Sequence, residues 1–202
     1  MSDFTYETEN RSNKYETYEW DNIWIEHANE IGRKRAAYIG DSISVGTRRI
    51  ATARTNEEIL FDGFGTSKAL DNPYFKDSIR LFLNQVPNID TVLFNNGLHG
   101  WHLDDETEYK VLYDEMIQFI LSEIKGARLY ILLITAVENN EDNKRVKIRN
   151  TAAREVAEKY SIPVIDLYDI TSANISEISP DGIHPTEPLY EKIADEIIRN
   201  IR

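Results

Sequence analysis

Short apolar runs alternate with amphipathic segments along most of this 202-residue chain. The runs have the length of β-strands, and the segments between them carry apolar residues at helical spacing. The expected strands span residues 36–39, 59–61, 91–94, 130–134 and 162–165. Because strands that alternate with helices form parallel sheets covered on both faces, we expect an α/β fold. The pattern predicts a three-layer α/β/α sandwich around a five-stranded parallel sheet.

The alternating pattern covers residues 36–202 without a linker or an internal repeat, which predicts a single domain. Residues 1–35 precede it, and we expect them to pack on the domain as a polar arm followed by a short helix. Trp20, Trp24 and His27 lie at helical spacing, so this helix should include them. We expect their rings to be buried in the core rather than to line a site.

Charge and composition exclude several classes of protein. The chain has 35 acidic and 23 basic residues, a net charge of -12, and basic residues that are scattered. We therefore expect neither nucleic acid nor a membrane surface as a partner. The absence of cysteine excludes disulfides, a thiolate nucleophile and cysteine-based metal sites. No stretch has the length of a membrane span, and the polar N-terminus has no secretory signal, so we expect a cytoplasmic protein.

The turn after the first expected strand carries a candidate nucleophile. A Gly-Asp-Ser sequence ends there at Ser42, and parallel sheets usually bind ligands beyond the carboxyl ends of their strands. A serine hydroxyl is a weak nucleophile until a base removes its proton. His184, just before the last expected helix, can supply that base, and Asp181 can orient its imidazole. These three residues are the expected catalytic triad.

Acyl transfer also needs hydrogen-bond donors for the oxyanion. The backbone N–H groups of Ser42 and Gly65 are candidates, because glycine lets a backbone approach a ligand closely. Asn95 and His99 follow the third expected strand and offer an amide and an imidazole. If this segment stays extended, both side chains point to one face. We expect Asn96 to serve in a turn.

The motifs resemble those of the SGNH (GDSL-type) hydrolases, a family of serine esterases and lipases with a flavodoxin-like α/β/α fold. Residues 39–43 match the family's first block, which carries the nucleophile, and Asp181 and His184 match its fifth block, D-x-x-H. Gly65 best matches the glycine of the second block, with Gly63 as the other choice. The resemblance implies a Ser42–His184–Asp181 triad that needs neither a cofactor nor a metal ion.

The third block departs from the family pattern, G-x-N-D, whose asparagine donates to the oxyanion. Here His99 stands at the asparagine position and Gly100 at the aspartate position. Either His99 or Asn95 therefore remains as the side-chain donor. The Phe-Asn-x-Gly-Leu segment around Asn95 also resembles a subset of the family associated with carbohydrate esterases.

The resemblance implies a serine esterase that works through an acyl-enzyme. Polar and aromatic residues near the expected mouth favour a short acyl group on a polar substrate such as an acetylated carbohydrate; they are Asn95, Asn96, Trp101 and His102. A lysophospholipase or thioesterase of the same family is an alternative. A binding protein that has lost activity on this scaffold is another, favoured only by the altered third block.

Other short motifs give weaker predictions. His99 and His102 form an H-x-x-H pair with Asp104 and Asp105 nearby. The spacing does not identify three metal ligands, so we expect no metal site. Ser44 should already lie within the helix that follows Ser42. A near match to the nucleophile motif G-x-S-x-G lies at residues 65–69, but its final glycine is missing.

Overall fold

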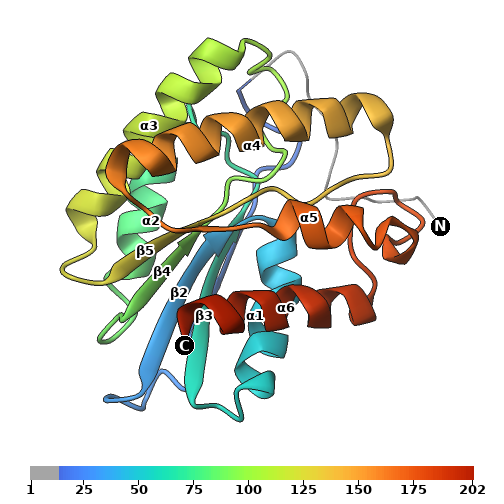
Figure 1. The fold of residues 1–202 in the computed structure, drawn as a ribbon. Helices are drawn as coiled ribbons and strands as arrows, with labels where there is room; N and C mark the ends of the chain where they lie inside the picture. The colour runs from blue at the N-terminus through green and yellow to red at the C-terminus, as the bar shows by residue number, and fades with distance from the viewer. Residues whose placement is uncertain (1–13) are drawn as a thin grey trace.

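A computed structural model describes residues 14–202 of the chain (Figure 1). Residues 1–13, which hold most of the expected arm, lie outside the described part. The strands are β1 (Asp21–Trp24), β2 (Lys34–Gly40), β3 (Ile59–Thr66), β4 (Thr91–Phe94), β5 (Arg128–Leu132) and β6 (Val164–Ile165). The helices are α1 (Ser42–Arg54), α2 (Phe75–Leu83), α3 (Glu106–Glu123), α4 (Asn140–Tyr160), α5 (Leu167–Ser172), η1 (Ile175–Glu177, a 3-10 helix) and α6 (Glu187–Ile201).

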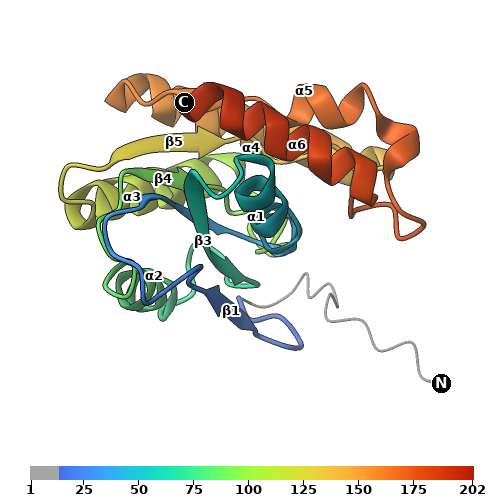
Figure 2. The same ribbon diagram turned by 90° about the horizontal axis from the view of Figure 1, so that it is seen from below.

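One sheet joins the strands in the order β1-β3-β2-β4-β5-β6. Strands β2 to β6 run parallel, as expected, and β1 adds an antiparallel strand at the edge beside β3 (Figure 2). The chain leaves β2 toward β3 on one side and then crosses back to β4 on the other. Open α/β sheets bind ligands at such a reversal, beyond the carboxyl ends of the strands. The loops that follow Gly40 and Phe94 lie at this point.

Helices cover both faces of the sheet and complete the expected three layers. Helices α1 and α6 pack on one face, and α2, α3 and α4 cover the other (Figure 1, Figure 2). Strand β2 is buried on both sides, since Ala37 and Ile39 join one core while Ala36 and Tyr38 join the other. Burial on both faces explains why this strand is a continuous apolar run in the sequence.

The helix expected around Trp20, Trp24 and His27 does not form, which corrects that prediction. Residues Asp21–Trp24 pair with β3 instead, with Trp24 opposite Gly63. Trp24 is 42% exposed rather than buried in the core. His27 lies in the following turn with a φ of 43°. The open edge of β3 offers unpaired backbone groups, and pairing with them outweighs helical spacing in so short a segment.

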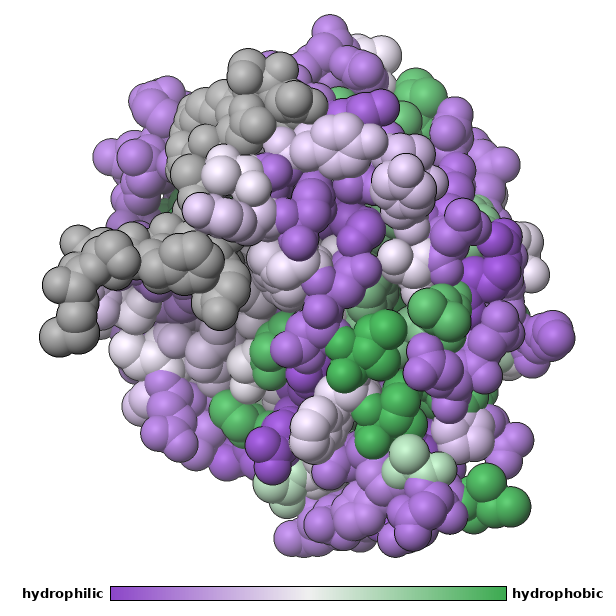
Figure 3. All heavy atoms as spheres, turned by 180° about the vertical axis from the view of Figure 1, so that it is seen from behind, coloured by the Kyte–Doolittle hydropathy of each residue, from purple (hydrophilic) through white to green (hydrophobic). Residues whose placement is uncertain are grey.

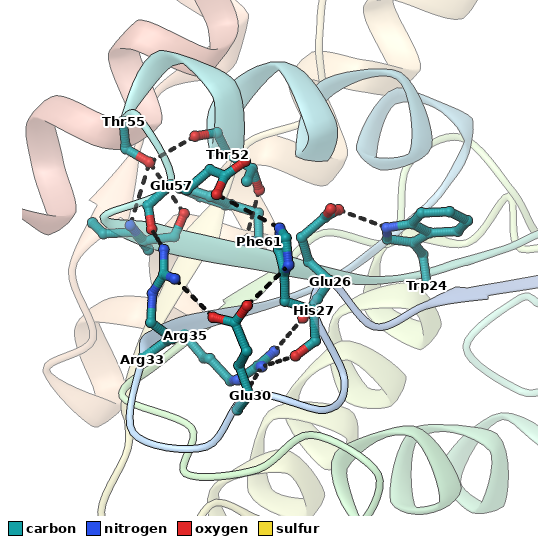
Figure 4. A network of polar contacts seen from close by, with 11 residues as sticks. Trp24, Glu26, His27, Glu30, Arg33, Arg35, Thr52, Thr55, Glu57 and Phe61 are labelled. Atoms are coloured by element: carbon teal, nitrogen blue, oxygen red, sulfur yellow. Dashed lines mark hydrogen bonds and ion pairs between the residues drawn. The ribbon is translucent and has the colours of Figure 1, made fainter.

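A buried ion pair holds this turn against the sheet, and its arginine, Arg35, is seen in Figure 4 beside the turn residues Glu26, His27 and Glu30. Arg35 and Asp62 lie on neighbouring strands with fully buried side chains, and 2.9 Å separates Nη1 from Oδ1. The Arg35 guanidinium also donates to the carbonyl oxygens of Glu26, His27 and Glu30. Burial raises the pKa of Asp62, although hydrogen bonds from Arg35 and from the Glu26 N–H oppose that rise. Because β2 already begins at Lys34, the expected boundary at residue 36 falls inside a strand.

Strand β3 extends beyond the expected 59–61 and includes Gly63 and Gly65, which the pattern assigned to a loop. Helix α1 packs directly on these glycines. A methyl group at Gly63 would collide with the Arg48 side chain, and one at Gly65 with that of Val45. The two glycines therefore allow close contact between helix and sheet.

The surface turned away from the viewer in Figure 1 is mostly hydrophilic, with a cluster of hydrophobic side chains below its centre and a few separate ones elsewhere (Figure 3). This distribution agrees with a net charge of -12. Within residues 14–202, none of the helices combines the length and the apolar character needed to cross a membrane.

Candidate active site

Ser42, His184 and Asp181 form a hydrogen-bonded chain at the carboxyl end of β2. Ser42 Oγ lies 2.9 Å from His184 Nε2, and His184 Nδ1 lies 2.8 Å from Asp181 Oδ2. A carboxylate accepts the Nδ1 hydrogen, which makes Nε2 the acceptor for the serine hydroxyl. The fold thus brings together the three expected catalytic residues, although Ser42 and His184 are 142 positions apart.

Ser42 is the first residue of α1 and follows β2 after a single residue. Asp41 caps the helix, since its Oδ1 accepts the Ile43 N–H at 2.9 Å. The N–H of Ser42 belongs to the first turn, whose N–H groups have no acceptor within the helix and carry the positive end of the helix dipole. Ser44 is buried and donates its hydroxyl to the Asp41 carbonyl at 2.6 Å, so it is not placed as a rival nucleophile.

A tight turn carries Asp181 and His184. Gly182 has a φ of 78°, which lies in the left-handed region that favours glycine. Backbone hydrogen bonds close the turn, from the Gly182 N–H to Ser179 O at 2.9 Å and from the Ser179 N–H to His184 O at 2.7 Å. Asp181 Oδ1 accepts the N–H groups of Ile183 and His184, each at 2.9 Å. The carboxylate and the imidazole are therefore fixed on one side of the turn.

The charge of Asp181 is stabilised where it lies. Burial raises its pKa, but the N–H groups of Ile183 and His184 and the imidazole N–H outweigh this effect and hold the pKa well below its usual range. Asp181 is consequently an anion at neutral pH and favours an imidazolium beside it.

Asn95, one of the two expected side-chain donors, joins the ends of two strands. Its Nδ2 donates to Leu132 O at 3.0 Å, and its Oδ1 accepts the Gly97 N–H. The side chain is buried. These bonds tie the end of β4 to the end of β5, which differs from the expected role toward an oxyanion.

His99, the other expected donor, contacts the N-terminal segment. Its Nδ1 lies 3.5 Å from Glu16 Oε1, and both side chains are largely buried. The Trp20 ring meets the imidazole edge to face, with 6.1 Å between ring centroids. Neither Glu16 nor Trp20 belongs to the motifs, and no local pattern in the sequence points to them.

Gly65, the expected backbone donor, is part of the ladder between β3 and β1. It pairs with Asn22, and two residues further on the Ser67 N–H donates to Trp20 O. Hydrogen-bonded pairs alternate with non-bonded pairs in antiparallel ladders, so Gly65 and Asn22 form a bonded pair. The Gly65 N–H is thus directed at β1 and away from β2, which corrects the expectation. Gly63, the other choice, has the same orientation.

The Ser42 turn lies between the end of β3 and the segment that follows β4. The Thr66 N–H has the opposite orientation to that of Gly65 and faces β2, where the pairing of Gly40 with Gly65 uses it as the donor to the Gly40 carbonyl oxygen, so it is not available to an oxyanion. Gly97 packs on the turn itself, since a methyl group there would collide with the Asp41 carboxylate. The segment that contains His99 therefore lies against the residue before Ser42.

The expected mouth residues are arranged differently from the prediction. Trp101 is 5% exposed, and the Arg145 guanidinium lies over its ring at 5.2 Å, so its faces are not open for stacking. Asn96 is buried and donates to Lys68 O at 3.1 Å. His102 is half-buried, and its Nε2 lies 3.0 Å from Asp71 Oδ2. Among residues 14–202 no group of three histidine or acidic side chains is placed to hold a metal ion.

Solved structures share this architecture. The acetyl xylan esterase AlAXEase is 16% identical, with a TM-score of 0.63 over 83% of this chain and 100% of that one. A member of the lipolytic G-D-S-L family from Veillonella parvula DSM 2008 is 16% identical, with a TM-score of 0.61 over 83% and 98%. The chain has the SGNH (GDSL-type) hydrolase fold.

A third solved structure with this fold matches a similar share of the chain. Axe2, an acetylxylan esterase from Geobacillus stearothermophilus, is 13% identical, with a TM-score of 0.62 over 85% of this chain and 95% of its own. No family model and no curated protein matches the sequence. At such identities the likeness establishes the SGNH fold, and the chemistry has to be argued from the site.

Proposed function

We propose that this protein is a serine ester hydrolase in which Ser42 is the nucleophile, His184 the general base and Asp181 the residue that orients it. The observation that carries the proposal is the unbroken chain from Ser42 Oγ to His184 Nε2 and from His184 Nδ1 to Asp181. Such a chain activates a hydroxyl that is otherwise a poor nucleophile. Its position at the strand reversal of an α/β sheet supports the same conclusion.

In the first half of the reaction, Ser42 Oγ attacks the acyl carbon and its proton passes to His184 Nε2. Asp181 stabilises the resulting imidazolium through Nδ1. Collapse of the tetrahedral intermediate breaks the ester bond, and the imidazolium protonates the departing alcohol. Water then gives a proton to His184 and attacks the acyl-enzyme, which releases the acid and restores Ser42.

The oxyanion needs donors near the Ser42 turn, and two groups are suited to the task. The Ser42 N–H lies at a helix N-terminus. His99 stands at the family's asparagine position on a segment that packs against Asp41. Asn95 is less suited, because its amide donates to Leu132 O.

For the substrate we propose a short acyl ester, such as acetate, of a carbohydrate or similarly polar alcohol. Two of the structures with this fold are acetylxylan esterases, which supports the proposal. The Arg145 guanidinium covers the Trp101 ring. Trp20, whose ring meets the His99 imidazole edge to face, is the aromatic residue that we propose for contact with a sugar instead. A long-chain ester or thioester is the alternative that a substrate series must test.

The experiment is hydrolysis of p-nitrophenyl acetate by the wild type and by Ser42→Ala. We expect Ser42→Ala to lose at least about a thousandfold in kcat, as triads do when a member is removed. Ser44→Ala serves as the matched control, because its hydroxyl binds Asp41 O. Equal rates for wild type and Ser42→Ala, or fluorophosphonate labelling at another residue, would refute the proposal.

The substrate is tested with a chain-length series of p-nitrophenyl esters beside acetylated xylo-oligosaccharide, a long-chain lysophospholipid and an acyl thioester. We expect kcat/KM to be highest for acetyl esters and acetate to be released from the sugar. A preference for long acyl chains or for the thioester would overturn the substrate assignment while leaving the triad intact.

A further inference from the structure

Helix α4 places a cation in the protein interior beside the altered third block. The residue Arg149 is 2% exposed, and its guanidinium lies over the Tyr109 ring at 4.5 Å. Burial lowers the pKa of Arg149 to about 10, so the group keeps its positive charge at neutral pH. Burying an arginine costs free energy unless its N–H groups have hydrogen-bond acceptors, so the acceptors of Arg149 indicate its role.

The partners of Arg149 are backbone carbonyls of one short turn. Its Nη1 donates to His99 O at 2.9 Å and to Gly97 O at 3.4 Å, and its Nη2 donates to Gly100 O at 2.7 Å. One planar group therefore binds three carbonyl oxygens within four residues. This contact fixes the shape of the turn, which has φ values of 64° at Gly97 and 77° at Gly100.

Arg145, one helical turn earlier on α4, holds the next part of the same loop. Its Nη2 donates to the carbonyl oxygens of Gly100, Trp101 and Leu103 at 3.1, 2.7 and 2.9 Å. Its Nη1 pairs with Asp104. The charge of Arg145 thus has a carboxylate partner, whereas the hydrogen bonds of Arg149 run to neutral carbonyl groups.

The carbonyls that face Arg149 also set the direction of the neighbouring N–H groups. In a trans peptide the C=O and N–H point in opposite directions. The N–H groups of Leu98, Gly100 and Trp101 are therefore directed away from α4. On its other side the turn packs on Asp41, next to Ser42.

We propose that Arg149 is a positioning residue for the esterase reaction. It holds the 97–100 turn, and with it the His99 imidazole, at a fixed distance from Ser42 Oγ. Its buried charge adds a favourable potential for the negative charge that develops on the substrate carbonyl oxygen. This inference rests on the proposed function, and it concerns a residue that touches neither the triad nor the substrate.

The test compares Arg149→Met and Arg149→Lys with the wild type on p-nitrophenyl acetate, with each rate divided by the concentration of sites titrated with a fluorophosphonate. We expect Arg149→Met to lower kcat by about 10- to 100-fold with a nearly constant KM, the usual effect of misplaced reacting groups. Arg149→Lys keeps the charge but loses the planar fork, so its kcat should lie between the two. The acid limb of the pH profile should not move, because it reports His184.

Arg154→Met is the matched control, since Arg154 lies on the same helix at the surface and pairs with Asp166. Should Arg149→Met fail to fold, Arg149→Lys gives the same test, and guanidinium chloride added to Arg149→Ala below denaturing concentrations should restore kcat where sodium chloride does not. A kcat per titrated site equal to that of the wild type, or a loss seen only as fewer titratable sites, would overturn the inference.

The failures of the two proposals are distinguishable. If Ser42→Ala is inactive and Arg149→Met is fully active per site, the positioning role is wrong and the esterase mechanism stands. If Ser42→Ala retains wild-type activity, the mechanism is wrong and the role of Arg149 falls with it.

Discussion

The carboxylate of Glu16 lies against the imidazole of His99, with 3.5 Å between Oε1 and Nδ1. This contact joins two segments that the sequence pattern treated separately. Glu16 lies before the first strand, outside the family motifs, while His99 takes the position of the asparagine in the third block. A partner on one ring nitrogen orients a histidine and determines what the other nitrogen can do. The N-terminal segment therefore belongs to the candidate site.

We expect Glu16→Gln to lower kcat/KM for p-nitrophenyl acetate by about 5- to 30-fold, the kinetic equivalent of about 1–2 kcal/mol from a lost charge-assisted contact. The amide keeps the shape of the side chain but not its charge. Glu58→Gln is the control, because Glu58 lies at the other end of the sheet and pairs with Arg202. Unchanged kinetics for Glu16→Gln would show that Glu16 has no role in the reaction.

Asp181→Asn tests the orientation of the base. The amide oxygen can still accept the backbone N–H groups of Ile183 and His184, so the turn should keep its shape. The amide cannot stabilise an imidazolium, and it favours the wrong tautomer of His184. We expect kcat to fall by about 10³- to 10⁴-fold, as found for triads in general, with little change in KM. A loss smaller than tenfold would contradict the assignment.

The low pKa of Asp181 also predicts how stability depends on pH. Its folded-state pKa lies below the unfolded value of about 3.9, so its ionised form stabilises the fold at every pH above that value. This contribution is lost as the pH falls toward the folded-state pKa. Urea unfolding should therefore show a smaller difference in stability between wild type and Asp181→Asn near pH 3 than near pH 5. A difference that grows at pH 3 would show that the sign is wrong.

Gly97→Ala should reduce both stability and activity, because Gly97 has a φ of 64° and a methyl group there would collide with Asp41. Gly126→Ala is a matched control. Gly126 has a φ of 88°, but nothing lies within 4 Å of the added methyl group. We expect Gly126→Ala to cost about 1–2 kcal/mol of backbone strain with normal kcat. Gly97→Ala should cost more in urea unfolding and lose kcat, and equal effects in both variants would contradict the contact.

Arg35→Met should destabilise the fold by about 3–5 kcal/mol, because it leaves the Asp62 carboxylate buried without its partner. Arg199→Met is the comparison, since Arg199 pairs with Glu196 at the surface and such pairs contribute about 0–1 kcal/mol. Urea unfolding measures both variants. Activity per titrated site should remain normal in Arg35→Met. A stability change as small as that of Arg199→Met would show that the Arg35–Asp62 pair does not stabilise the fold.

The fold was largely predictable because it depends on patterns within short segments. Buried parallel strands such as β2 and β4 are continuous apolar runs in the sequence. Strand β1 was missed because four exposed residues carry no strand signal. It forms only because β3 has an open edge beside it.

The sequence by itself determined the five parallel strands, the serine on the turn after β2 and the short spacing that lets Asp181 meet His184, because each depends on neighbouring residues. Only the tertiary structure decided that Asn95 joins β4 to β5, that the Gly65 N–H faces β1, and that Glu16 and Arg149 reach the 97–100 turn. These contacts connect residues far apart in the chain. No local period or motif encodes such contacts, since they follow from how the elements pack.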